Sequence, residues 1–265
     1  MTDELITNVS DGVATLTMNR PERMNAMTSN MMEAMLFHLQ DYENDDSVGC
    51  IVVRGVGRAF SSGGDVKGQA IRLSETAPID PQSRIADLRR RMQVSQLLHD
   101  IGKPTIAMLN GVAAGAGFSL ALACDLRIAC RSARMTSAFA KVGLSGDYGG
   151  SYFLTKLAGP ARARELYFTS AILTSSQMME YGLANRVVDD DRLEEETMAL
   201  ARSLASGPRV AWRYMKRNLN VSEKGTLAEL LDCEAEGMIL SGLTEDRKEA
   251  VKAFTEKRAP VFRGR

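Results

Sequence analysis

Two glycine-rich segments, roughly fifty residues apart, are the parts of this chain best suited to chemistry. They read RAFSSGGD at residues 58–65 and NGVAAGAGF at residues 110–118. Each follows an apolar run typical of a buried strand, and the second leads into a helical pattern. Small residues let backbone N–H groups approach a ligand closely, and a helix N-terminus favours negative charge. The pair predicts a two-donor oxyanion hole, with ordinary tight turns as the alternative.

The elements that would hold these segments alternate between strand and helix patterns. A hairpin is expected around Asp11-Gly12, because the residues on both sides alternate with period two. Thr28 and Ser29 can cap an amphipathic helix, and a polar stretch at residues 74–83 predicts a loop over the site. Strands are expected at residues 5–9, 13–18, 48–53 and 105–109, and helices at residues 29–39, 85–98 and 118–123. This order predicts an α/β core.

The C-terminal third of the chain is expected to be mostly helical, because strand patterns fade beyond residue 171. Helices are expected at residues 175–181, 193–205, 210–218, 227–240 and 245–254. No linker or low-complexity tract separates this region from the rest. We therefore expect it to pack on the α/β core or on a neighbouring subunit.

Composition excludes several classes of protein. The chain has 265 residues, is 45% hydrophobic, and carries 33 basic and 33 acidic residues, so no net charge attracts it to nucleic acid or to an anionic membrane. The four cysteines lack metal-ligand spacing, and no apolar stretch is long enough to span a membrane. The acidic N-terminus does not resemble a secretory signal. We expect a cytoplasmic enzyme without a metal site.

Five ordered motifs carry a family resemblance that extends over nearly the whole chain. They are NRPERMNA at residues 19–26, the two glycine-rich segments, ALACD at 121–125 and FTEKRAP at 254–260. Together they resemble the enoyl-CoA hydratase/isomerase (crotonase) superfamily. A single glycine-rich segment would be weak support, but five motifs in the family's order are specific.

The resemblance implies a crotonase-like spiral β/α core with a helical C-terminal oligomerisation region. It divides the chain into an acyl-CoA-binding core at residues 1–195 and a trimerisation region at residues 196–265. The implied ligand is an acyl-CoA thioester, and coenzyme A is part of the substrate rather than a separate cofactor. The implied assembly is a homotrimer or a dimer of trimers.

By matching position, the resemblance gives Gly64 and Ala116 the two backbone N–H groups that bind the thioester oxygen as an enolate forms. Preorganised donors of this kind are commonly worth roughly 3 kcal/mol each in a transition state. The resemblance also assigns coenzyme A contacts to Arg23, Ala26, Ser62, Gly63, Phe254 and Lys257. The last two match C-terminal positions that often reach the coenzyme A of a neighbouring subunit.

Family hydratases use two glutamates, one that holds the water and one that protonates the α-carbon. Aligned through residues 115–121, the first position is Ser119, and aligned back from Gly143 the second is Phe139. A phenyl ring transfers no proton, and a serine hydroxyl is a very weak acid or base without an activating partner. Both positions are expected to line the acyl-binding site.

A different carboxylate, Asp147, stands four residues after Gly143. In the superfamily this position holds the working aspartate of several non-hydratase branches, and residues 138–150 resemble the ring-epoxide phenylacetyl-CoA isomerases most. We predict that Asp147 is the acid/base of an isomerase. The alternative is that Asp147 caps a helix beginning near Gly149, and the two roles are compatible.

Other functions fit the sequence less well than isomerisation. A hydratase (lyase) of fatty-acid or aromatic-acid degradation is second, because the glutamate pair that positions water is absent. A dehalogenase with Asp147 as nucleophile is third. A non-catalytic acyl-CoA-binding oligomer is the alternative from another class, and Asp147 argues against it.

Overall fold

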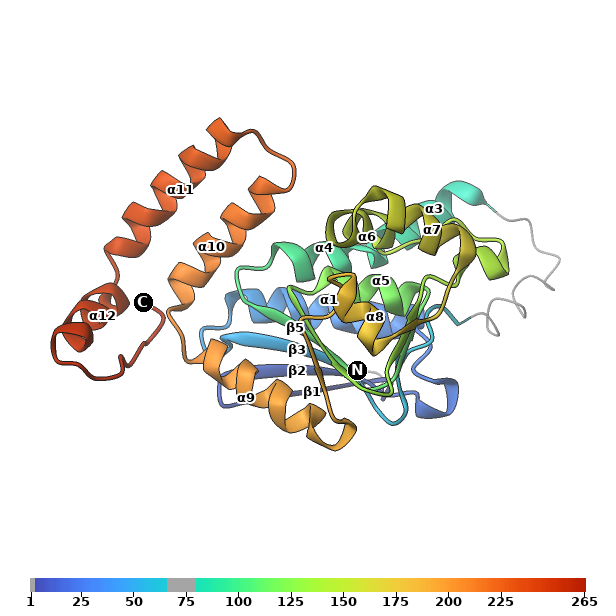
Figure 1. The fold of residues 1–265 in the computed structure, drawn as a ribbon, viewed down its shortest axis with the longest axis horizontal. Helices are drawn as coiled ribbons and strands as arrows, with labels where there is room; N and C mark the ends of the chain where they lie inside the picture. Colours follow the sequence, from blue (N-terminus) through green and yellow to red (C-terminus); the bar gives the residue numbers. More distant parts are fainter. Residues whose placement is uncertain (1–2, 66–79) are drawn as a thin grey trace.

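The computed structural model describes residues 3–65 and 80–265, which form an α/β core with two sheets and a helical arm that projects from it (Figure 1). The larger sheet has six strands in the spatial order β1 (Leu5–Ser10), β2 (Val13–Met18), β3 (Cys50–Gly55), β5 (Thr105–Leu109), β7 (Leu126–Cys130) and β10 (Arg186–Val188). β1 and β2 form the expected antiparallel hairpin, since Asp11 and Gly12 both have positive φ, as a tight hairpin turn requires. The other strands pair in parallel.

A smaller sheet contains β4 (Ala59–Ser61), β6 (Val112–Ala114), β8 (Arg134–Thr136) and β9 (Leu173–Thr174), in that order. Three consecutive strand pairs, β3/β4, β5/β6 and β7/β8, each contribute one strand to each sheet. This repeat is the spiral predicted for the core. The smaller sheet matters for function because β4 and β6 lie inside the two glycine-rich segments.

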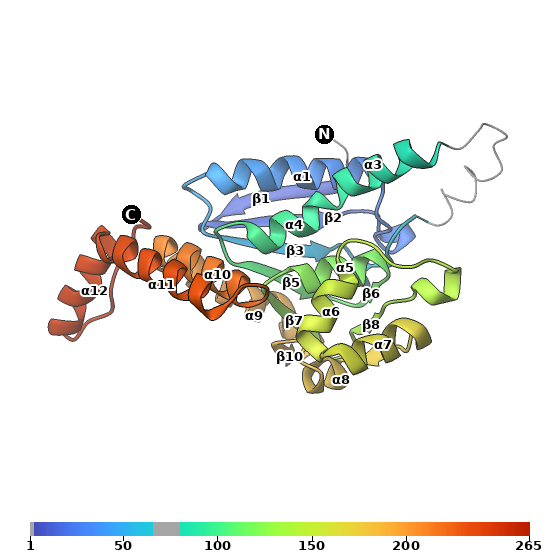
Figure 2. The same ribbon diagram turned by 90° about the horizontal axis from the view of Figure 1, so that it is seen from above.

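Helices cover both faces of the larger sheet (Figures 1 and 2). On one face lie α1 (Ser29–Asn44), α3 (Pro81–Arg91), α4 (Gln93–Asp100) and α5 (Ala116–Ala123), and on the other lies α9 (Leu193–Ala205). Of the two expected caps, Thr28 caps α1 by accepting a hydrogen bond from the Met31 amide at 3.1 Å, and Ser29 is the first residue of the helix. Near the smaller sheet lie η2 (Phe139–Val142), α6 (Gly150–Ala158), α7 (Pro160–Thr169) and α8 (Ser175–Glu180).

The arm consists of α10 (Arg209–Ser222), α11 (Leu227–Gly242) and α12 (Glu245–Thr255), and it extends away from the sheets (Figures 1 and 2). The predicted boundary between residues 195 and 196 falls inside α9, which packs on β3, β5 and β7. The division at this point stays a prediction. No helix among the described residues is long and apolar enough to cross a membrane.

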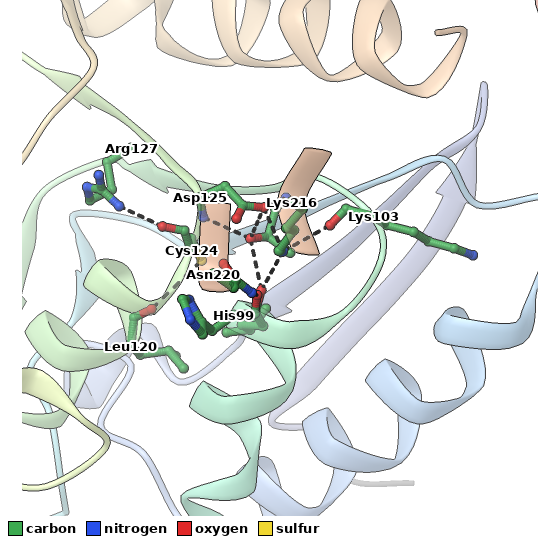
Figure 3. Close-up of polar contacts among 10 residues, drawn as sticks. His99, Lys103, Leu120, Cys124, Asp125, Arg127, Lys216 and Asn220 are labelled. Carbon is green, nitrogen blue, oxygen red and sulfur yellow. Dashed lines mark hydrogen bonds and ion pairs between the residues drawn. The ribbon is translucent and has the colours of Figure 1, made fainter. Parts of the chain in front are cut away.

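A partly buried ion pair links the base of the arm to the core (Figure 3). The Lys216 ammonium of α10 lies 2.8 Å from the Asp125 carboxylate and donates hydrogen bonds to the carbonyls of Leu98 and Lys103 at 2.9 and 3.2 Å. Asp125 also accepts hydrogen bonds from the amide and the hydroxyl of Thr105. The lysine therefore satisfies acceptors from three separate parts of the core.

Lys216→Met is expected to lower the free energy of unfolding by about 3 kcal/mol. The change removes the ammonium group that pairs with the partly buried Asp125 carboxylate, so the negative charge is left without its cation. Urea unfolding of the variant beside Lys224→Met, which removes an exposed lysine, measures the difference. Equal unfolding free energies for the two variants would mean that the pair contributes nothing net.

Several expected elements differ from the structure. The helix expected at residues 85–98 is two helices, α3 and α4, that meet at Met92. The expected loop at residues 74–83 lies outside the described residues up to residue 79, and Pro81 already begins α3. The sequence pattern also missed β9 and β10, because strands of two or three residues are too short to show a period.

Candidate active site

Parallel pairing of β4 with β6 brings the two glycine-rich segments together. Ala59 pairs with Val112 and Ser61 with Ala113, so the residues that follow both strands meet at one edge. Gly63 is in close contact there: a Cβ on it would lie 2.7 Å from the Ala114 carbonyl oxygen and 3.1 Å from the Ala116 amide nitrogen. With φ at +91°, this position requires glycine for both space and conformation.

The two predicted N–H donors lie on either side of this contact. Ala116 is the first residue of α5, so the helix leaves its N–H without an internal acceptor. Gly64 forms a parallel bridge with Met27, whose amide donates to the Gly63 carbonyl at 2.7 Å. The geometry places a backbone donor at a helix N-terminus next to a second loop held in a fixed position. That arrangement can stabilise a developing oxyanion.

The residues expected to contact coenzyme A on this chain form one pair of loops beside Gly64. The Ser62 amide donates to the Met24 carbonyl at 2.9 Å, and the Ser62 hydroxyl donates to the Arg23 carbonyl at 3.3 Å. Ala26 is buried and donates its amide to the Arg23 carbonyl, while the Arg23 side chain is exposed. The structure therefore brings Arg23, Ala26, Ser62 and Gly63 together.

Asp147 lies in the loop between η2 and α6, within a backbone of unusual conformation. Gly146, Tyr148 and Gly149 all have positive φ, and for Tyr148 the value of 51° is costly. The Asp147 Oδ1 atom is buried and makes no hydrogen bond among the described residues. Burial raises the pKa of this carboxyl to about 6. A carboxylate in this setting can act as an acid or a base near neutral pH.

Helix capping does not account for Asp147. The N-cap of α6 is Gly149, and no side chain caps this helix. Asp147 contributes only its backbone carbonyl, which accepts a hydrogen bond from the Gly150 amide at 3.1 Å. The alternative that the carboxylate serves as a cap is therefore wrong, because the turn of glycines supplies the helix start without it.

Ser119 and Phe139, at the two positions where family hydratases have glutamates, are both buried. The Ser119 hydroxyl donates to the Gly115 carbonyl one turn earlier in α5, at 3.3 Å. The Phe139 ring lies against Gly115, where a Cβ would be 3.8 Å from Cε1. Both side chains thus contact Gly115 of the second glycine-rich segment.

Tyr167 of α7 is a neighbour of these residues that the sequence pattern did not single out. Its ring stacks on Phe139, with centroids 6.0 Å apart and an angle of 18° between the planes. A Cβ on Gly150 would lie 2.6 Å from the Tyr167 hydroxyl oxygen and 2.2 Å from Ser119 Oγ. The hydroxyl of Tyr167 therefore reaches the Ser119 side of the site. No signal in the local sequence could have placed it there, because the contact depends on how α7 packs on η2.

Comparison with known proteins identifies the family. Residues 8–265 match the family model described as enoyl-CoA hydratase/isomerase. The chain belongs to the enoyl-CoA hydratase/isomerase family.

Two relatives and one solved structure illustrate the range of this family. The chain is 37% identical over 270 residues to 1,2-epoxyphenylacetyl-CoA isomerase of Escherichia coli (strain K12), with 100% of each chain covered. It is 34% identical over 262 residues to trans-2-decenoyl-(acyl-carrier-protein) isomerase of Streptococcus mutans serotype c, covering 99% of this chain and 98% of the relative. Enoyl-CoA hydratase from Bacillus anthracis superposes with a TM-score of 0.92 at 27% identity, covering 99% of this chain and 100% of that one.

Two expected contacts of this enoyl-CoA hydratase/isomerase family member are not near the site. Phe254 belongs to α12 and is 86% exposed, and Lys257 follows the end of that helix. Both lie on the arm, away from the sheets that hold the glycine-rich segments (Figure 1). Within one chain they do not approach Asp147, so their role in binding coenzyme A requires a neighbouring subunit and stays a prediction.

Acidic, histidine and cysteine side chains form no group of three or more that could hold a metal ion within residues 3–65 and 80–265. Asp65, which follows Gly64, pairs instead with Arg20, with 3.2 Å between Oδ2 and Nη1.

Proposed function

We propose that this protein isomerises an unsaturated or aryl-acetyl-CoA thioester, with Asp147 as the single acid/base. The observation that carries the proposal is the state of the Asp147 carboxyl, whose Oδ1 is buried and without a hydrogen bond in the described part of the chain. A carboxylate held free of partners is ready to take a proton from a bound substrate. The names of the two isomerase relatives also support this reaction class.

The proposed reaction moves one proton and one double bond. Asp147 removes a proton from a carbon activated by the thioester, and the electrons of the broken C–H bond move toward the thioester oxygen. The N–H groups of Gly64 and Ala116 stabilise the resulting enolate. Asp147, now protonated, returns the proton at another carbon of the conjugated system. No water is added, and no cofactor is needed beyond the coenzyme A of the substrate.

The proposal includes an oligomer, a homotrimer or a dimer of trimers built through the arm. Large apolar side chains exposed on or beside the arm helices support it: Leu219, Leu227, Met238, Ile239, Leu243 and Phe254. Monomeric proteins rarely expose so many large apolar groups in one region. In such an assembly Phe254 and Lys257 would contact the coenzyme A bound by a neighbour.

Hydration is the second candidate, favoured by the structural similarity to the Bacillus anthracis enoyl-CoA hydratase. Mass spectrometry in heavy water separates the two reactions. Enoyl- and aryl-acetyl-CoA thioesters are incubated with the protein, and deuterium uptake, double-bond position and added water are followed together. Exchange or migration without a water adduct supports the isomerase, whereas a hydrated product supports the hydratase. Neither change in any thioester would leave acyl-CoA binding as the function.

Activity is expected to rise with pH through about pH 6 and then to level, because the ionised form of Asp147 is the base. Burial raises the pKa of this carboxyl to about 6, so at lower pH a growing fraction is protonated and inactive. The measurement is kcat/KM, or the deuterium exchange rate, between about pH 4.5 and 8.5. A profile that stays flat down to the lower limit would contradict the role of Asp147.

A further inference from the structure

Ser61, the last residue of β4, carries a fully buried hydroxyl at the point where the first glycine-rich segment leaves the sheet. The hydroxyl oxygen accepts a hydrogen bond from the Gly63 amide at 3.1 Å. It also donates a hydrogen bond to the Asn25 carbonyl at 2.8 Å. Buried side chains of this kind usually satisfy backbone groups that lie outside regular secondary structure. The hydroxyl therefore joins the loop that follows β4 to the loop that contains Asn25.

The hydrogen bond to Gly63 matters because the carbonyl of this glycine belongs to the peptide unit that carries the Gly64 N–H. That carbonyl accepts a hydrogen bond from the Met27 amide at 2.7 Å, within a parallel bridge between Met27 and Gly64. The C=O and N–H of a planar trans peptide unit point in opposite directions, so the Gly64 N–H points away from Met27. Glycine is the most flexible residue, and here Ser61 holds its N–H while Met27 holds its C=O. The direction of the Gly64 N–H thus depends on both contacts.

Ser61 is also in close contact with the second glycine-rich segment. A Cβ on Gly117 would lie 2.7 Å from both the Cβ and the carbonyl oxygen of Ser61, and 2.9 Å from its Oγ. Gly117 is the second residue of α5 and follows Ala116, whose N–H is the other proposed donor. Because the first turn of α5 packs directly on Ser61, a shift of this side chain also affects the start of the helix. One serine therefore contacts both of the segments that supply the proposed N–H donors.

We infer that Ser61 is a positioning residue of the proposed oxyanion hole, whose hydroxyl holds the loop that carries Gly64 at a fixed separation from Ala116. The inference rests on the proposed function for the role of these two N–H groups. Ser61→Ala would keep nearly the same packing but remove the hydrogen-bond partner of the Gly63 amide and of the Asn25 carbonyl, both next to a buried side chain. Because oxyanion donors are effective through preorganisation, a loop that can relax stabilises an enolate less well.

Ser61→Ala is expected to lower kcat about tenfold, while the dissociation constants of acyl-CoA thioesters change by less than about threefold. Infrared spectroscopy gives a readout that does not require turnover. The probes are phenylacetyl-CoA and crotonyl-CoA, isotope-labelled at the thioester carbonyl. Hydrogen bonds lower the stretching frequency of a carbonyl, so binding to the wild-type protein should lower it, and binding to the variant should lower it less. The matched control is Ser95→Ala, because the buried Ser95 Oγ makes no hydrogen bond among the described residues. That control should keep the wild-type kcat and frequency.

Wild-type kcat and a wild-type frequency shift in Ser61→Ala would overturn the inference, and a lower melting temperature with both values unchanged would show a purely structural role. Ser61→Cys is the second variant, because sulfur has a similar size but is a weak hydrogen-bond acceptor. Its kcat and frequency should lie between those of the wild-type protein and Ser61→Ala, and wild-type values in it would also overturn the inference. The absence of a shift in the wild-type protein would refute the oxyanion hole and the inference together. A shift without any isomerisation would refute only the proposed reaction.

Discussion

Asp147→Asn is expected to reduce turnover by on the order of 10³-fold or more, while the dissociation constants of acyl-CoA thioesters change only a few-fold. The amide has nearly the shape of the carboxyl but cannot take up a proton. The reduction should appear in kcat and in the rate of deuterium exchange, because every proposed step uses the same group. Wild-type turnover in this variant would refute the mechanism.

The matched control for this variant is Asp232→Asn, which changes an exposed aspartate on α11 and should leave turnover unchanged.

A control for folding follows from the raised pKa of Asp147. The folded state binds this proton more tightly than the unfolded state, so wild-type stability is lost as the pH rises from the ordinary aspartate value to about 6. Asparagine does not ionise, so at pH 8 the variant should melt at the same or a higher temperature. Lost activity with retained stability would then report on chemistry alone.

Gly63→Ala is expected to lower kcat by on the order of 10²-fold, the usual effect of losing one oxyanion donor. The new Cβ would lie 2.7 Å from the Ala114 carbonyl oxygen and 3.1 Å from the Ala116 amide nitrogen. Both neighbours are backbone atoms of a paired strand and a helix start, so the two glycine-rich segments must move apart. The N–H groups of Gly64 and Ala116, which are proposed to bind one oxygen, would then lie farther apart.

Gly143→Ala provides the control for backbone strain in this experiment. Gly143 also has positive φ, at +70°, but a Cβ there meets nothing within 4 Å. Both alanine variants incur the strain of a positive φ, but only Gly63→Ala also meets backbone atoms, so it should lose more stability and only it should lose activity. Steady-state kinetics and melting curves on the two proteins separate the effects. An equal fall in kcat for Gly63→Ala and Gly143→Ala would show that catalysis does not depend on the spacing of the two glycine-rich segments.

Much of the fold was predictable because its signals are local. The turn at Asp11-Gly12 needs two positive φ values, and the cap at Thr28 needs only the amide three residues later. Both depend on neighbours in the chain, so a single sequence reveals them. The same holds for the glycine-rich segments, whose small residues are needed for close backbone contact. By contrast, β10 was missed because three residues become a strand only by pairing with β7, more than fifty positions earlier.

The sequence by itself determined the α/β order, the family, the two glycine-rich segments and Asp147 as the carboxyl to examine. Only the tertiary structure decided that Gly63 touches the start of α5, that Asp147 is no helix cap, and that Tyr167 reaches the Ser119 side of the site. It also showed that α12, which contains Phe254, lies on the arm away from the two sheets. The physical reason is that secondary-structure propensity and motif spacing depend on residues that are near one another in the chain. Burial, the stacking of Tyr167 on Phe139 and a raised pKa depend on side chains that meet only when distant elements pack together.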